Sequence, residues 1–255
     1  MSDSILSHTD AGLLTLRLDR PQKKNALTRE MYAALADALL AADADERVRA
    51  VLLTGSSECF TSGNDVGDFL ARPPEGESPA LCFMRALFNL RKPVVAAVAG
   101  PAVGIGTTLL LHCDLVYVSR DARLQMPFVK LGLCPEFGSS RILPRLLGQT
   151  RAAQLILLGE AFSGEQAVAW GIANECLEGG EATLARAEEV ARQLTRLAPA
   201  ALADSKQLMR GPEREGLWQV IEKESELFAE RLRSPEAVEA LNAFMERREA
   251  DFSKL

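Results

Sequence analysis

The chain has 255 residues, of which 47% are hydrophobic and 25% charged, so it can form a globular fold that needs neither disulfides nor a structural metal. Its 29 basic and 35 acidic residues give a net charge of −6, which does not supply the basic field that nucleic-acid binding requires. No apolar run is long enough to span a bilayer, and five isolated cysteines are typical of reduced thiols in an intracellular protein.

The first half of the chain alternates between patterns typical of strands and of helices. Alternating apolar and polar residues predict a half-buried strand at 12–19, and Thr28 is a plausible N-cap for an Ala- and Leu-rich helix at 30–42. The next expected elements are, in chain order, a strand at 48–54, a turn-rich loop at 60–68, a helix at 78–90, a strand at 94–99, a glycine-punctuated turn at 100–106, a buried helix at 107–112 and a strand at 114–119. This alternation predicts an α/β core with parallel strands.

After about residue 137 the pattern is almost wholly helical. The expected elements are a short strand at 172–177 and helices at 182–197, 200–209, 217–232 and 235–248. We therefore divide the chain into a core of residues 1–197 and a C-terminal helical region of residues 198–255. The apolar stripes of that region could pack on the chain's own core or on another subunit.

Two glycine-bearing turns follow predicted strands, at 62–65 (SGND) and 100–106 (GPAVGIG). Glycine lets the backbone turn sharply and leaves peptide N–H groups facing outward, so two such turns could aim two donors at one substrate oxygen. They could equally be ordinary strand-to-helix connections. The second turn is not a dinucleotide fingerprint, because Leu109 stands where G-x-G-x-x-G requires its last glycine.

Glu136 is a carboxylate in an apolar stretch, LGLCPEFGSS. Apolar surroundings raise the pKa of a carboxyl towards the range that suits proton transfer near neutral pH. The same residue could instead cap a helix that begins around Gly138, where a negative charge is favoured. His112, one of only two histidines, lies in an apolar helix-like run, which favours a packed or capping role over catalysis.

Several ordered segments of the chain resemble the enoyl-CoA hydratase/isomerase (crotonase) superfamily. They are RPQKKNALT, FTSGNDV, AGPAVGIGTTLLLHCDLVYVS, MPFVKLGLCPEFGSSRILPRLLG and LLGEAFSGEQAVAWGIANECL. The resemblance is strong over residues 12–180. It implies a crotonase-type ββα spiral core with a C-terminal helical region that forms trimer contacts and covers the active site. It also implies assembly as a homotrimer or a dimer of trimers.

The resemblance implies the parts of an acyl-CoA site as well. The peptide N–H groups of Asn64 and Ile105 would form an oxyanion hole that holds the thioester oxygen and stabilises the enolate left when a proton leaves the α-carbon. The residues expected to contact the substrate or its coenzyme A part are Lys24, Ala26, Ser62, Gly63, Asp65, Val66 and Phe128. Lys24 could equally be a solvated loop charge, and Asp65 and Asp114 suit structural roles in a turn and a cap. No metal and no separate cofactor is implied, because coenzyme A is part of the substrate.

The departures from the family pattern concern the reaction. Hydratases of the family use two glutamates, and the matching positions here are Thr108 and, in the segment Met126-Pro127-Phe128, Phe128. Neither side chain accepts a proton near neutral pH. Glu136 stands where Δ3,Δ2-enoyl-CoA isomerases carry their one catalytic glutamate, so we expect conversion of 3-enoyl-CoA to 2-enoyl-CoA, with Phe128 helping to exclude water.

Three alternatives stay open. They are a ring-epoxide acyl-CoA isomerase of aromatic catabolism, an enoyl-CoA hydratase with atypical bases, and a non-catalytic acyl-CoA-binding homologue. The Arg- and Ala-rich composition favours the bacterial cytoplasm, although the terminal Ser253-Lys254-Leu255 matches a peroxisomal address.

Overall fold

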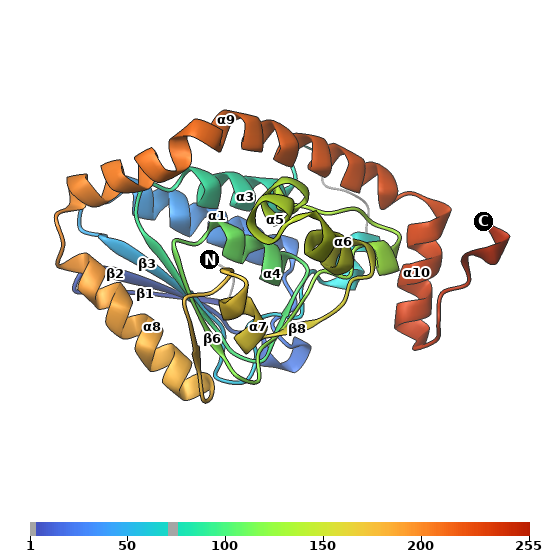
Figure 1. Cartoon of the computed structure of the whole chain (residues 1–255), viewed down its shortest axis with the longest axis horizontal. Helices are drawn as coiled ribbons and strands as arrows, with labels where there is room; N and C mark the ends of the chain where they lie inside the picture. Colours follow the sequence, from blue (N-terminus) through green and yellow to red (C-terminus); the bar gives the residue numbers. More distant parts are fainter. Residues whose placement is uncertain (1–3, 71–75) are drawn as a thin grey trace.

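A six-stranded sheet forms the centre of the protein, whose computed structural model describes residues 4–70 and 76–255 (Figure 1). Its strands lie in the order β1-β2-β3-β4-β6-β9. They are β1 (Ile5–Asp10), β2 (Leu13–Leu18), β3 (Ala50–Thr54), β4 (Val94–Val98), β6 (Leu115–Ser119) and β9 (Glu175–Leu177). β1 and β2 pair antiparallel, and each other neighbouring pair in this sheet is parallel, as predicted for the core.

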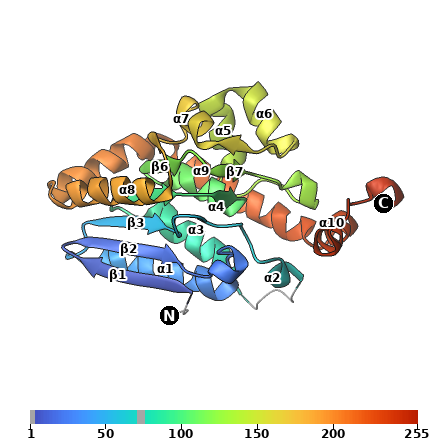
Figure 2. The same cartoon turned by 90° about the horizontal axis from the view of Figure 1, so that it is seen from below.

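Helices cover both faces of this sheet, two on one face and one on the other (Figures 1 and 2). They are α1 (Arg29–Ala44) and α3 (Pro79–Asn89) on the first face and α8 (Gly180–Thr195) on the second. Along β3, Val51 and Leu53 join the large core with α1 and α3, whereas Ala50 and Leu52 pack on the side of α8. Because both faces are buried, β3 is apolar along nearly its whole length, which is the pattern that predicted a parallel strand.

The core also contains a second, smaller sheet, and the order of strands and helices along the chain repeats between the two sheets. Its strands are β5 (Pro101–Val103), β7 (Arg123–Gln125) and β8 (Phe162–Ser163), in the order β5-β7-β8. β4 leads into β5 and then a helical turn, and β6 leads into β7 and then another. A strand of each sheet followed by a helix matches the predicted ββα spiral, and the α/β class is confirmed.

The remaining helices lie mostly in the second half of the chain. They are α2 (Val66–Leu70), α4 (Ile105–Thr108), α5 (Ser139–Leu147), α6 (Gln149–Leu157), α7 (Gly164–Ala169), α9 (Pro199–Arg231) and α10 (Pro235–Glu246), with 3-10 turns η1 (Pro21–Lys23), η2 (Leu109–His112), η3 (Val129–Leu131) and η4 (Phe252–Lys254). Among the described residues, no helix is both long and apolar enough to cross a membrane.

The helix α9 corrects one prediction. Two separate helices were expected at 200–209 and 217–232, but the structure has one 33-residue helix that crosses the top of the molecule and continues through Pro212 (Figure 1). Tertiary contacts hold its first half, because Lys206 and Arg210 pair with Asp114 at 2.8 Å and 2.7 Å. Asp114 also accepts a hydrogen bond from the N–H of Val94, so its predicted structural role is confirmed.

Other differences concern short or exposed elements. β1 was not predicted, because all of its residues after Ile5 are exposed and it has no apolar alternation. β7 and β8 have three and two residues and leave no periodic signal. The helix expected at 107–112 is divided between the four-residue α4 and the 3-10 turn η2.

Candidate active site

A cavity of about 990 Å³ opens between α1, α3, α9 and the loop that carries Glu136. Its lining combines apolar and polar side chains, among them Leu27, Tyr32, Asn64, Met84, Glu136 and Phe228. Of the residues predicted for the site, Asn64, Asp65 and Glu136 line this cavity. The predicted residues outside its lining are Lys24, Ala26, Ser62, Gly63, Val66, Ile105 and Phe128.

The two glycine-bearing turns lie against each other. Thr61 and Ala102 pair in a parallel bridge, so the turn after β3 runs beside β5. A Cβ atom on Gly106 would lie 2.5 Å from Cγ2 of Thr61, and one on Gly63 would lie 2.8 Å from the carbonyl oxygen of Val103. The approach is therefore too close for a side chain at either glycine.

The peptide groups of Asn64 and Ile105 are left available by this arrangement. Leu27 bonds to both neighbours of Asn64, donating to the carbonyl of Gly63 and accepting from the N–H of Asp65, so the N–H of Asn64 faces away from Leu27. Ile105 is the first residue of α4, where an N–H has no intrahelical acceptor. Within the described chain, neither N–H donates a hydrogen bond.

Tyr32 is a site residue that the sequence did not reveal. It lies on α1, lines the cavity and donates a hydrogen bond from its hydroxyl to Oδ1 of Asn64. Its ring packs near Phe83, with 5.6 Å between the ring centroids. In the sequence it belongs to the buried stripe of an ordinary helix, so no local pattern distinguishes it from a core residue.

The side chain of Glu136 is buried and lines the cavity. The residue is 5% exposed, and within the described chain its Oε1 is buried without a hydrogen-bond partner. Burial, with a smaller contribution from the charge of Glu224, raises its pKa to about 8. Such a carboxyl exchanges protons near neutral pH.

Glu224, from α9, fills the capping role that was considered for Glu136. Its carboxylate accepts hydrogen bonds from the N–H of Gly138 at 2.5 Å and from the N–H of Ser140 at 3.1 Å, and it also accepts one from the Ser140 hydroxyl. Glu136 contributes only its carbonyl oxygen there, which accepts from the hydroxyl of Ser139 at 2.7 Å. The sequence could not reveal this cap, because Glu224 lies 86 residues beyond Gly138.

His112 packs against the same loop. Its ring stacks on Phe137 with centroids 3.7 Å apart, and its Nε2 lies 2.7 Å from the carbonyl oxygen of Phe137. Burial lowers the pKa of His112 to about 3, so the ring is neutral at physiological pH. The predicted packing role of His112 is confirmed.

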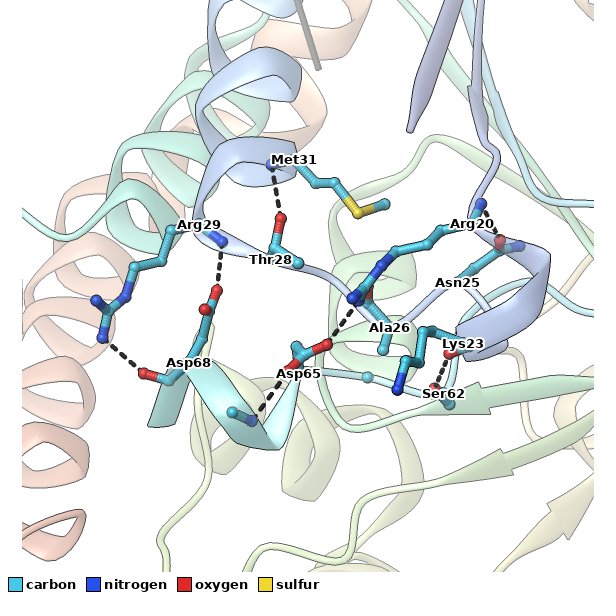
Figure 3. A network of polar contacts seen from close by, with 12 residues as sticks. Arg20, Lys23, Asn25, Ala26, Thr28, Arg29, Met31, Ser62, Asp65 and Asp68 are labelled. Atoms are coloured by element: carbon cyan, nitrogen blue, oxygen red, sulfur yellow. Dashed lines mark hydrogen bonds and ion pairs between the residues drawn. The ribbon is translucent and has the colours of Figure 1, made fainter. Parts of the chain in front are cut away.

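The loop predicted to meet coenzyme A is held together by its own polar contacts (Figure 3). Arg20 donates to Asp65 at 2.6 Å and to the carbonyl of Ala26 at 3.0 Å, while the hydroxyl of Ser62 lies 3.4 Å from the carbonyl of Lys23. Asp65 thus has the structural turn role considered for it. Lys24 is exposed and has a left-handed backbone, with φ at 49°.

Thr108 and Phe128, which the resemblance matches to the glutamates of hydratases, are both buried outside the cavity lining. Oγ1 of Thr108 has no hydrogen-bond partner among the described residues. Phe128 packs edge-on against Phe228, which does line the cavity, with ring centroids 6.4 Å apart. Over residues 4–70 and 76–255, no group of three His, Cys, Asp or Glu side chains is arranged to hold a metal ion.

The chain is similar to known proteins over nearly its whole length. The enoyl-CoA hydratase/isomerase family model matches residues 8–254. The chain is 36% identical to 1,2-epoxyphenylacetyl-CoA isomerase of Escherichia coli K12, over 99% of both chains. It is 35% identical to enoyl-CoA delta isomerase 2 of Rattus norvegicus, over 97% of this chain and 64% of that protein. The structure of Pseudomonas aeruginosa OdaA superposes with a TM-score of 0.95 at 61% identity, over 96% of this chain and 100% of that one.

Proposed function

The chain belongs to the enoyl-CoA hydratase/isomerase family, the crotonase superfamily, and on that premise we propose that it isomerises 3-enoyl-CoA to 2-enoyl-CoA with Glu136 as its single acid/base. At the coarser level it is an acyl-CoA isomerase or hydratase of that superfamily. The finer assignment to double-bond migration rests on the cavity and on its one buried carboxyl.

The proposed reaction needs one base and one pair of donors. Glu136 takes a proton from C2 of the substrate, the electrons of the broken C–H bond form a C1–C2 double bond, and the π electrons of the carbonyl move onto the thioester oxygen. The N–H groups of Asn64 and Ile105 donate hydrogen bonds to that oxygen in the dienolate. Donors aimed at the place where charge develops lower the barrier, usually more than any other single contribution. The same carboxyl then gives the proton to C4: the thioester carbonyl reforms, a C2–C3 double bond replaces the C3–C4 double bond, and atoms and charge balance without a co-reactant.

One observation carries this proposal: the carboxyl of Glu136 lines the cavity, and its Oε1 has no partner in the described chain. Because Glu224 already caps α5, capping does not require the Glu136 side chain. Thr108 and Phe128 cannot activate a water molecule as the two glutamates of a hydratase do. Other carboxylates of the described chain line the cavity, but of these only Glu136 is buried, and one such base is sufficient for isomerisation and insufficient for that route of hydration.

A second candidate is the isomerisation of a ring-epoxide acyl-CoA. It is favoured by the 36% identity to 1,2-epoxyphenylacetyl-CoA isomerase, which extends over 99% of that relative. A carboxyl whose pKa is about 8 is mostly protonated at neutral pH, so Glu136 could donate its proton to an epoxide oxygen.

The test compares the wild type with Glu136→Gln on a 3-enoyl-CoA, a 2-enoyl-CoA and a ring-epoxide acyl-CoA. We expect migration of the double bond in the first substrate, little hydration of the second, and a loss of about 10²- to 10⁴-fold in the variant. Glu230→Gln, an exposed change on α9, is the matched control and should keep full activity. Turnover of only the epoxide would favour the second candidate. Hydration that survives in Glu136→Gln would refute both, and tight binding without any turnover would identify a non-catalytic acyl-CoA binder.

Further parts of the proposal concern binding and assembly. We propose that coenzyme A contacts the loop of Lys24 and Ala26 and the backbone of residues 62–66, and that no separate cofactor takes part. The helical region 198–255 is proposed as cover and trimer contact. In support, α9 contributes Phe228 to the cavity, and α9 and α10 carry strongly exposed apolar residues. These are Leu208, Met209, Phe244 and Met245, each 61–77% exposed. We propose the bacterial cytoplasm as its location.

A further inference from the structure

We propose that Glu224 is a positioning residue for Glu136: it fixes the loop after Glu136 through that loop's own donors, and its negative charge shifts the ionisation of the Glu136 carboxyl towards neutral pH. This inference rests on the proposed function, because it takes Glu136 as the acid/base. It assigns a role in the reaction to the helix α9, far along the chain from the catalytic loop.

The donors around Glu224 favour its ionised form. Its two oxygens accept from the N–H groups of Gly138 and Ser140 and from the Ser140 hydroxyl. These N–H groups lie at the start of α5, where the helix has no acceptors of its own and a negative charge is stabilised. Burial raises the pKa of Glu224 above its usual value, and these three donors reduce that rise by stabilising the ionised form.

Glu136 has the opposite surroundings. It is buried beside Glu224, and its Oε1 has no partner in the described part of the chain. When two buried carboxyls interact and only one has donors, the charge resides on that one and the other keeps its proton. Burial and the Glu224 charge together raise the pKa of Glu136 to about 8.

The other titratable groups that interact with Glu136 do not replace Glu224 as a source of charge. They are Tyr32 on α1 and Cys134 in the same loop. Burial raises the pKa of the Tyr32 hydroxyl well above its usual value, and burial with the nearby Glu224 raises that of the Cys134 thiol to about 11. Both are neutral at pH 7, and His112 behind the loop is neutral as well.

Contacts from α9 also set the backbone that aims Glu136. Phe137 and Gly138 both have left-handed backbones, with φ at 55° and 74°. A Cβ atom on Gly138 would lie 2.7 Å from Cδ1 of Leu217, so α9 packs directly on this turn. Glu224, about two helical turns beyond Leu217 on α9, accepts a hydrogen bond from the N–H of the same Gly138, so two points of the helix contact this turn.

The test measures kcat/KM on a 3-enoyl-CoA at about pH 6 and pH 9 in the wild type, Glu224→Gln, Glu224→Asp and Glu230→Gln. Loss of the Glu224 charge should let Glu136 ionise at lower pH, so the ratio of the pH 6 value to the pH 9 value should rise about tenfold in Glu224→Gln. Glu224→Asp keeps the charge and should keep the wild-type ratio while kcat falls. Glu230→Gln should match the wild type. A folded Glu224→Gln with an unchanged ratio, or an equal change in Glu230→Gln, overturns the proposal.

Two further measurements keep the test decisive. If Glu224→Gln does not fold, Ser140→Ala removes one donor from Glu224 and should raise the same ratio by less; no rise overturns the proposal. If the wild type does not isomerise a 3-enoyl-CoA, the proposed function fails, but the effect of Glu136→Gln on Tm still reports the protonation of Glu136. The rise in Tm caused by Glu136→Gln should increase with pH when Glu224 is present, and it should increase less with pH when Glu224 is replaced by Gln. An equal increase in the presence and absence of Glu224 overturns the proposal.

Discussion

Replacing Glu136 by Gln should stabilise the folded protein, and more strongly as the pH rises. A carboxyl with a folded-state pKa of about 8, against 4.5 in the unfolded chain, takes up protons on folding between these values. The stability that wild type has below about pH 4.5 is therefore lost progressively up to about pH 8. Gln has the same shape but cannot ionise, so the variant does not lose this stability.

The magnitude follows from the two pKa values. The slope is about 1.4 kcal/mol for each pH unit and smaller near the two pKa values, so wild type should lose about 3.5 kcal/mol relative to Glu136→Gln between pH 5 and pH 8. For a chain of this length, about 1 kcal/mol corresponds to about 2–4 °C in Tm, so the advantage of the variant should grow by about 7–14 °C over this range.

The assay is thermal unfolding of wild type, Glu136→Gln and Glu46→Gln at equal protein concentration, from pH 5 to pH 8. Glu46→Gln is the matched control, because Glu46 is exposed before β3 and its replacement should leave the Tm difference independent of pH. A Tm difference between wild type and Glu136→Gln that stays constant across the range would refute a buried, protonated Glu136. Such a result would also remove the physical basis for its acid/base role.

Three more predictions follow from the site and its supports. If Glu136 first acts as a base, kcat/KM for isomerisation should rise about tenfold per pH unit below pH 8 and level off above it; a flat pH–rate profile from pH 6 to pH 9 would contradict this. Gly106→Ala places a Cβ atom 2.5 Å from Thr61 Cγ2, which should displace the Ile105 N–H and lower kcat about 100-fold. Gly179→Ala is the control, because Gly179 has open space around it, and it should leave kcat unchanged in the same assay. Asp114→Asn leaves the buried Lys206 without its carboxylate and should lower the free energy of unfolding in urea by about 3–5 kcal/mol. A loss no larger than that caused by Asp45→Asn would show that the Lys206–Asp114 ion pair does not stabilise the fold.

Most of the core was predictable because its signals are local. The buried strand β3 is apolar along nearly its whole length, and Thr28 accepts a hydrogen bond from the N–H of Met31 as an N-cap should. The missed and corrected elements have nonlocal causes. β1 is defined by its pairing with β2 and not by its own exposed residues, and α9 continues through Pro212 because contacts with the core hold it.

The candidate site divides in the same way. The sequence made Glu136 a candidate because a carboxylate in an apolar segment is unusual within its own neighbourhood of the sequence, although a capping role was equally open. Glu224 and Tyr32 could not, since each belongs to a regular helix and meets the site only through folding. For the same reason, only the structure could show that Glu224 on α9, and not the side chain of Glu136, caps α5.

The continuity of α9 links the fit of the acyl group to the chemistry. This one continuous helix supplies Phe228 to the cavity wall and Glu224 to the loop that follows Glu136. An acyl group too bulky for the wall would displace the same helix that holds the loop of Glu136, the acid/base of the proposed reaction. We therefore expect a series of substrates of increasing girth to slow in turnover before they weaken in affinity.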